Sequence, residues 1–194
     1  LRKPFKKKII NFHKELTDRT LSMASHATVL ERDENLSDWR SVAQQVNNHP
    51  EVEGVAPYFR AEGMLVNDKQ VSGTVIRGIL PEEEIKISEI SDKMIEGALS
   101  NLRAGEFGVI LGKELSRSLH VLTGDKVTLV APQANVTPAG ILPRLKRFTV
   151  VGVFEVGMQE FDSALALIHL NDAQKLFRKD SPSGLRIKTT DIMR

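Results

Sequence analysis

The sequence predicts an α+β fold, because its expected strands and helices are mixed along the chain without a repeated βα rhythm. No segment recurs at a fixed period, which excludes a repeat architecture. The 194 residues are enough for one large domain or two small ones, and a hydrophobic content of 41% can supply a core. We therefore expect a mixed fold with two lobes.

Composition excludes several classes of function. A net charge of +2 and an aromatic fraction of 5% argue against a nucleic-acid binder. The chain has no cysteine, so disulfides, thiolate catalysis and cysteine-ligated zinc are excluded. No apolar run reaches the 18 or so residues of a membrane span, and the start of the chain lacks the apolar core of a signal peptide.

The first elements are a basic segment, a helix, a strand and a second helix. Residues 1–8 carry five basic side chains, as in a solvated tail or a juxtamembrane anchor. From Ile9 an apolar stripe at helical spacing predicts a helix, and residues 27–31 form a short strand. Ser37 should cap the next helix, which ends at residues 47–50. Its Trp39 is expected to be a core anchor.

A hairpin and a short helix follow. Residues 52–66 and 70–80 predict two strands joined by a turn. Pro81 opens a short helix with Glu82, Glu83 and Glu84 in its first turn, where the helix dipole favours acids. Consecutive residues point around a helix, so these glutamates cannot converge on one metal ion, and we expect them to be solvated.

The middle of the chain contains a segment that imitates a phosphate-binding loop. Residues 88–102 predict helix and loop, residues 107–111 a buried strand, and residues 112–120 a helix. Between Gly108 and Gly112 there are three residues instead of four, and Glu114 replaces the hydroxyl that would hold magnesium. Nucleotide binding is therefore rejected.

The C-terminal part predicts a strand at 165–169, a helix capped by Asn171 with Gln174 at capping-box spacing, and a last strand at 185–189. The five histidines are scattered, and no Gly-x-Ser-x-Gly elbow occurs. We expect no catalytic site, no metal and no cofactor.

The most informative stretch is residues 124–155. Two β-runs, 126–131 and 148–154, flank a connection of residues 132–147 that is longer than an ordinary hairpin loop. Its three prolines should stiffen it and keep it out of a sheet. No acid occurs from Lys126 through Phe154, so Arg144, Lys146 and Arg147 form an uncompensated basic foot. These features predict a protruding element that docks an acidic partner with an apolar recess.

Three ordered motifs resemble the permease subunits of lipoprotein-releasing ABC transporters of the LolC/LolE type. Asn11–Leu16 resembles the stretch that follows the family's first membrane helix. Val109–Leu115 together with Leu122–Val127 is similar to its Gly-x-x-Leu and Gly-Asp signature. Thr137-Pro138-x-Gly140, Pro143 and Arg147–Gly152 resemble the loop and return strand of the LolC type.

The resemblance implies a periplasmic domain with a porter-like subdomain, an inserted second subdomain and a projecting hairpin, the hook, that recruits the chaperone LolA. It implies a location at the bacterial inner membrane and, as partners, an ATPase subunit, a second permease subunit, outer-membrane-directed lipoproteins and the membrane through flanking helices. The residues implied for the hook are Pro132, Val136, Thr137, Pro138, Ala139, Gly140, Ile141 and Pro143, with Arg144, Lys146 and Arg147 as basic support.

The division implied by the resemblance is 1–24 for a tail and juxtamembrane helix, 25–80 for the first part of the porter-like subdomain, 81–124 for the inserted subdomain, 125–155 for the hairpin and 156–194 for a truncated return. ATP hydrolysis would lie on a separate subunit. Two alternatives stay open: a macrolide-exporter or cell-division permease domain that docks another protein, and a soluble enzyme.

Overall fold

The fold is described by a computed structural model that covers residues 27–30, 36, 38–137 and 140–190. The helix expected from Ile9 and the two residues Pro138 and Ala139 lie outside the described residues. In the described part of the chain, no helix has the length and apolarity that a membrane crossing needs.

Strands dominate, and short helices connect them, so the α+β class is confirmed. The strands are β1 (Ala27–Leu30), β2 (Val52–Asn67), β3 (Gln70–Ile79), β4 (Met94–Gly97), β5 (Gly108–Gly112), β6 (Lys126–Thr137), β7 (Gly140–Phe154), β8 (Leu165–His169) and β9 (Gly184–Thr189). The helices are α2 (Trp39–Asn47), α3 (Pro81–Ile87), α4 (Lys113–Leu119), α5 (Gln159–Ala164) and α6 (Leu170–Phe177), with 3₁₀-helices η1 (Glu89–Lys93) and η2 (Leu99–Asn101).

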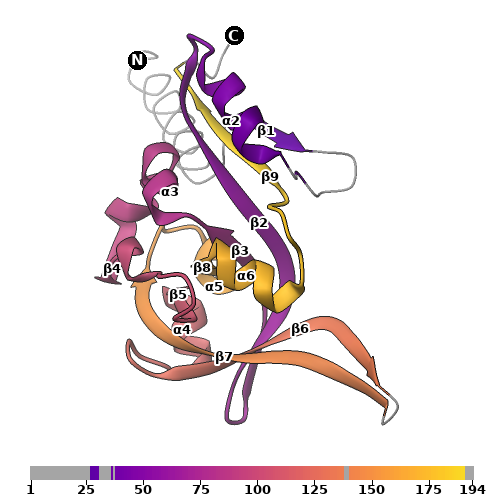
Figure 1. Ribbon diagram of the computed structural model, residues 1–194. Coiled ribbons are helices and arrows are strands. Elements are labelled where there is room, and N and C mark those ends of the chain that lie inside the picture. Colours follow the sequence, from indigo (N-terminus) through magenta and orange to yellow (C-terminus); the bar gives the residue numbers. More distant parts are fainter. Residues whose placement is uncertain (1–26, 31–35, 37, 138–139, 191–194) are drawn as a thin grey trace, which may run out of the picture.

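The strands form one nine-stranded sheet in the order β1-β9-β2-β3-β8-β5-β7-β4. Strand β6 lies off this path and pairs with both β2 and β7. The pairings therefore close on themselves through β2, β3, β8, β5, β7 and β6, while β1, β9 and the start of β2 extend from this ring (Figure 1). A closed ring leaves these strands few free edges.

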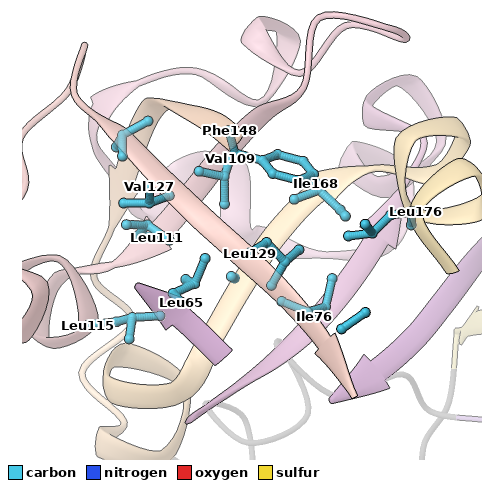
Figure 2. Packing of buried hydrophobic residues seen from close by; sticks show 14 of the residues in the cluster. Leu65, Ile76, Val109, Leu111, Leu115, Val127, Leu129, Phe148, Ile168 and Leu176 are labelled. Carbon is cyan, nitrogen blue, oxygen red and sulfur yellow. The ribbon is translucent and has the colours of Figure 1, made fainter. Parts of the chain in front are cut away.

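The largest apolar cluster draws on the ring strands and on two helices. Leu65, Ile76, Leu129 and Phe148 come from different strands and meet there, and Leu115 of α4 joins them (Figure 2). Helix α6 adds its own buried side chains to the same cluster, as the helical spacing in the sequence predicts. The ring strands are thus held together by one shared core.

The sequence of β8 is a continuous apolar run because both faces of this strand are covered. Ala166 and Ile168 belong to the first cluster, whereas Leu165 and Leu167 belong to a second cluster under η1 and η2. Successive side chains of a strand point to opposite faces, so a strand covered on both sides must be apolar at every position.

A third cluster lies around β1, β9 and the first half of β2, and α2 packs on it. Trp39 is half-buried against this cluster, as its expected role as a core anchor requires. The first two clusters take all their buried residues from 59–177, whereas the third takes its own from outside that range. The division into subdomains predicted from the resemblance stays a prediction.

Several predicted boundaries need correction. The N-cap of α2 is Asp38, not Ser37, and the side chain that caps α6 is His169, not Asn171. Residues 88–102, expected as helix and loop, contain the strand β4. Helix α5 was not expected at all. Strand β4 and helix α5 are short, so each offers too few residues for a periodic apolar pattern to be recognised.

The prediction of three solvated glutamates was wrong for Glu84. The Arg186 Nη1 atom donates to Glu84 Oε1 at 2.6 Å, and the two side chains are only 5% and 2% exposed. The other carboxylate oxygen, Oε2, is a buried atom without a hydrogen-bond partner in the described part of the chain. Burial and the neighbouring Arg186 lower the pKa of Arg77 to about 10, so this group stays cationic at neutral pH beside the pair.

The buried His169 makes stability depend on pH. Its Nδ1 atom accepts a hydrogen bond from the Asn171 amide at 3.2 Å, and burial lowers its pKa, although the Asp172 carboxylate opposes this. A lowered folded-state pKa means that the unfolded chain binds the proton more tightly, so stability is complete above the unfolded value and falls as the pH drops below about 6.5. We expect His169→Asn, which keeps a capping acceptor, to show a shallower loss between about pH 7.5 and 5.5. Urea unfolding at several pH values in this range measures the free energy of unfolding of both chains. An equal dependence of this free energy on pH in the parent chain and the variant would contradict the role assigned to His169.

Candidate protein-docking site

Strands β6 and β7 run beyond the body of the fold as a two-stranded ribbon (Figure 1). Cross-strand pairing continues from Lys126 opposite Thr149 up to Thr137 opposite Gly140. The prediction that residues 132–147 form a loop outside any sheet was therefore wrong. Residues 144–147 pair with 128–131 inside the ring, and residues 134–137 pair with 140–143 in the projecting part. We call residues 132–137 and 140–143 the ribbon.

The prolines explain how the ribbon differs from the ring. The register shifts between Ala131 and Ala134, where Pro132 lies, and Pro143 is paired with Ala134 directly beyond the shift. Proline donates no backbone hydrogen bond and is tolerated in strands at bulges and at edges. A two-stranded ribbon has one unpartnered side on each strand, so its prolines can be placed there without loss of a ladder bond.

The base of the ribbon is fixed to the body by two of the predicted basic residues. The Arg144 Nη1 atom donates to the Phe177 carbonyl oxygen, at the C-terminal end of α6, at 3.2 Å. The Lys146 Nζ atom lies 3.9 Å from the centroid of the Phe107 ring, which is a cation–π contact. Each of these two side chains therefore has a partner on the body, and neither of these two partners is an acid.

Phe107 is itself held in place by a buried acid. The Asp172 carboxylate accepts hydrogen bonds from the Gly105 amide at 2.7 Å and the Phe107 amide at 3.1 Å. Phe107 has a left-handed backbone with φ of 52°, and its ring packs edge-on against Phe148 at 5.5 Å. A chain of contacts therefore leads from α6 through the loop before β5 to the base of the ribbon.

The other predicted basic residue, Arg147, is exposed and lies opposite Thr128. In the described part of the chain, no salt bridge involves Arg147 or Lys146. Next to Arg147, the side chain of Leu145 is 60% exposed. Leu145 stands in one cross-strand row with Val130 and the exposed Met64, so an apolar row lies beside Arg147 at the base of the ribbon.

An open groove with a volume of about 400 Å³ lies between the base of the ribbon and α6. Its basic lining residues are Arg144, Lys146, Lys175 and Arg178, and its apolar ones are Phe107, Pro143, Leu145 and Leu176. We call it the basic groove. Lys175 and Arg178 were not among the predicted site residues. The cluster of cations at the end of α6 is visible in the sequence, but the helix dipole alone accounts for such a cluster.

The structure brings Pro132, Pro143, Arg144, Lys146 and Arg147 to the ribbon and its base. Val136 is paired with Ile141 and Thr137 with Gly140 in its outer part, while Pro138 and Ala139 lie outside the described residues. The roles of all these residues in binding stay predictions.

Metal and phosphate sites find no support in the described residues. Among them, no group of three or more His, Asp or Glu side chains is placed to hold a metal ion. Gly112, in the segment that imitates a phosphate loop, instead allows close packing, because a Cβ there would lie 2.4 Å from the Asp162 carbonyl oxygen. Gly112 therefore has a packing role at this position.

The match to a family model defines the class of this protein. The model of the MacB-like periplasmic core domain matches residues 5–192, and the chain belongs to that family. It is 42% identical over 181 residues, or 93% of its length, to the lipoprotein-releasing system transmembrane protein LolC of Neisseria meningitidis. It is 24% identical over 186 residues to the protein LolE of Haemophilus influenzae.

Each of these relatives is longer, and the chain spans 44% of its length. Among solved structures, the periplasmic region of MacB from Actinobacillus actinomycetemcomitans superposes with a TM-score of 0.53 over 87% of this chain and 69% of that one. The sequence identity is 15%, so this likeness supports the fold alone.

Proposed function

We propose that this chain is the periplasmic domain of a LolC-type permease subunit, located at the bacterial inner membrane. Within a lipoprotein-releasing ABC transporter it would work with an ATPase subunit, a second permease subunit and flanking membrane helices. The higher identity to LolC, 42% against 24% for LolE, supports the LolC type. In this proposal, ATP hydrolysis belongs to the separate ATPase subunit.

We further propose that the ribbon binds the chaperone LolA, which accepts the released lipoprotein. The observation that carries this proposal is the ribbon itself. It projects from the ring, and β6 and β7 stay paired along it up to Thr137 and Gly140. Arg144 and Lys146 fix its base, and so reduce the freedom that binding would otherwise remove. The exposed Leu145 and Arg147 supply an apolar and a cationic contact beside it.

Removal of the ribbon tests this proposal. Because Ala131 is paired with Arg144, an Asn-Gly turn in place of residues 132–143 should close the hairpin and keep the ring pairs below it. We expect the shortened chain to fold and to lose measurable LolA binding in a calorimetric titration. Pro138→Gly, which gives up the fixed φ of proline, should weaken binding by about 2 kcal/mol, as for a hot-spot residue.

A charge reversal on the body provides the matched control. Arg147→Glu beside the ribbon should weaken LolA binding, whereas Arg117→Glu on α4, which is also exposed to solvent, should not. Unchanged affinity for the shortened chain would remove the ribbon from the docking site.

A further inference from the structure

The basic groove gathers charge from two segments that are distant in sequence. Arg144 and Lys146 come from β7, and Lys175 and Arg178 come from the end of α6. No acidic side chain is among the described residues that line it. Like charges on the two walls of one groove repel each other, which costs folding free energy unless something else draws them together.

Contacts within the described part of the protein stabilise only some of the four cationic side chains in the groove. Arg144 has the Phe177 carbonyl oxygen as an acceptor, and Lys146 has the Phe107 ring. The Lys175 Nζ atom lies 4.0 Å from the position that a Cβ of Gly105 would take, so two ammonium groups border the loop of residues 105–107. The Asp172 carboxylate behind this loop is already engaged by the amides of Gly105 and Phe107.

The helix dipole does not offset the remaining charge. It supplies the equivalent of about half a negative charge at the end of α6, against four cationic side chains along the groove. In the described part of the chain, no salt bridge involves Lys175 or Arg178. The groove therefore offers a positive field to a ligand from outside.

We infer that the basic groove binds a carboxylate-bearing segment of the same protein that the ribbon holds, and that Lys175 and Arg178 are specificity residues for it. This inference rests on the proposed function. Pro143, at the body end of the ribbon, also lines the groove, so the two surfaces are continuous and one protein can contact both. The flanking Phe107 and Leu176 would contact the apolar parts of such a segment.

Neutral variants test the inference without a change of backbone. Lys175→Gln keeps a good helix former, and Arg178→Asn suits the left-handed conformation with φ of 53°. We expect the double variant to bind LolA about 3- to 10-fold more weakly at about 50 mM NaCl, with a melting temperature no lower than that of the parent chain, because the repulsion across the groove is relieved. The difference should shrink to less than about twofold at 500 mM NaCl, because salt screens exposed charges.

The matched control removes two charges elsewhere. Lys86 and Arg117 occupy the last turns of α3 and α4, as Lys175 does in α6, but neither lines the groove. Lys86→Gln with Arg117→Gln should therefore leave LolA affinity unchanged. If the groove variant binds like this control while the shortened ribbon fails to bind, the inference is overturned and the proposed function stands.

Two other outcomes separate the remaining explanations. If the shortened ribbon binds LolA as well as the full chain, the proposed function fails, and the inference that depends on it fails with it. Vesicles that contain phosphatidylglycerol provide the second probe. If the vesicles bind the parent chain and fail to bind the groove variant, while LolA binds both chains equally well, the groove is a lipid-headgroup site and the inference is overturned.

Discussion

Replacement of Arg186 with methionine is expected to lower the free energy of unfolding by about 3–5 kcal/mol. Arg186 is the hydrogen-bonded partner of the buried Glu84, and its loss leaves that carboxylate with two unsatisfied oxygens inside the protein. The half-buried Arg77 is close enough to interact with Glu84, but no hydrogen bond joins them among those described. Urea unfolding followed by circular dichroism measures the loss.

A surface pair of similar length serves as the control. Lys86 Nζ lies 2.7 Å from Glu83 Oε2, but the lysine side chain is 56% exposed, so Lys86→Met should cost less than about 1 kcal/mol. The double variant Glu84→Leu/Arg186→Met should be less destabilised than the sum of its two single variants, because it removes both buried charges. Similar small costs for Arg186→Met and Lys86→Met would show that the Glu84 pair does not support the fold.

Asp172→Ala is expected to destabilise the protein by about 3 kcal/mol, because two backbone amides lose a charged acceptor. The Asp172 side chain is fully buried, and it accepts from Gly105 and Phe107. The left-handed backbone of Phe107 depends on this support, as does the ring on which Lys146 rests. The effect should therefore reach the base of the ribbon.

Hydrogen exchange locates this effect. The amides of Gly105 and Phe107 should exchange much faster in Asp172→Ala than in the parent chain, while those of β9 should follow only the global loss of stability. Asp172→Asn keeps one carbonyl oxygen as an acceptor and should lose less stability than Asp172→Ala. A stability of Asp172→Ala within about 0.5 kcal/mol of the parent chain would contradict the role assigned to this carboxylate.

The sequence predicts those elements whose cause is local. The β2–β3 hairpin follows from two alternating runs around Asn67-Asp68-Lys69, and β8 follows from an apolar run of five residues. Helix α6 was predicted from its buried Ala173, Leu176 and Phe177, although its capping residue was wrong. In His169 the acceptor is a ring nitrogen, which the usual capping preferences do not include.

Contacts between distant residues were not predictable in the same way. Glu84 and Arg186 are 102 positions apart, so the first turn of α3 gave no sign that one of its three acids is buried. The closure of the ring depends on β6 pairing with β2, which no local pattern indicates. The short elements β4 and α5 owe their form to the neighbours on which they pack.

The candidate site was predicted in part. Three prolines and an acid-free run marked residues 132–147, and the structure places part of them on a projecting ribbon. The strand pairing along this ribbon was missed, because prolines normally argue against a strand, whereas Pro132 lies at a register shift and Pro143 is paired directly beyond it. The second wall of the basic groove, with Lys175 and Arg178, comes from a helix some 30 residues further on.

The most direct test of the docking role is the calorimetric titration of LolA into the parent chain and into the chain with an Asn-Gly turn in place of residues 132–143. Before the titration, urea unfolding should give both proteins a single cooperative transition with a similar midpoint, as expected if both keep the ring core. We predict saturable binding to the parent chain and no measurable heat of binding to the shortened one. Binding of equal affinity to both would contradict the central claim that the β6–β7 ribbon is the element that LolA recognises.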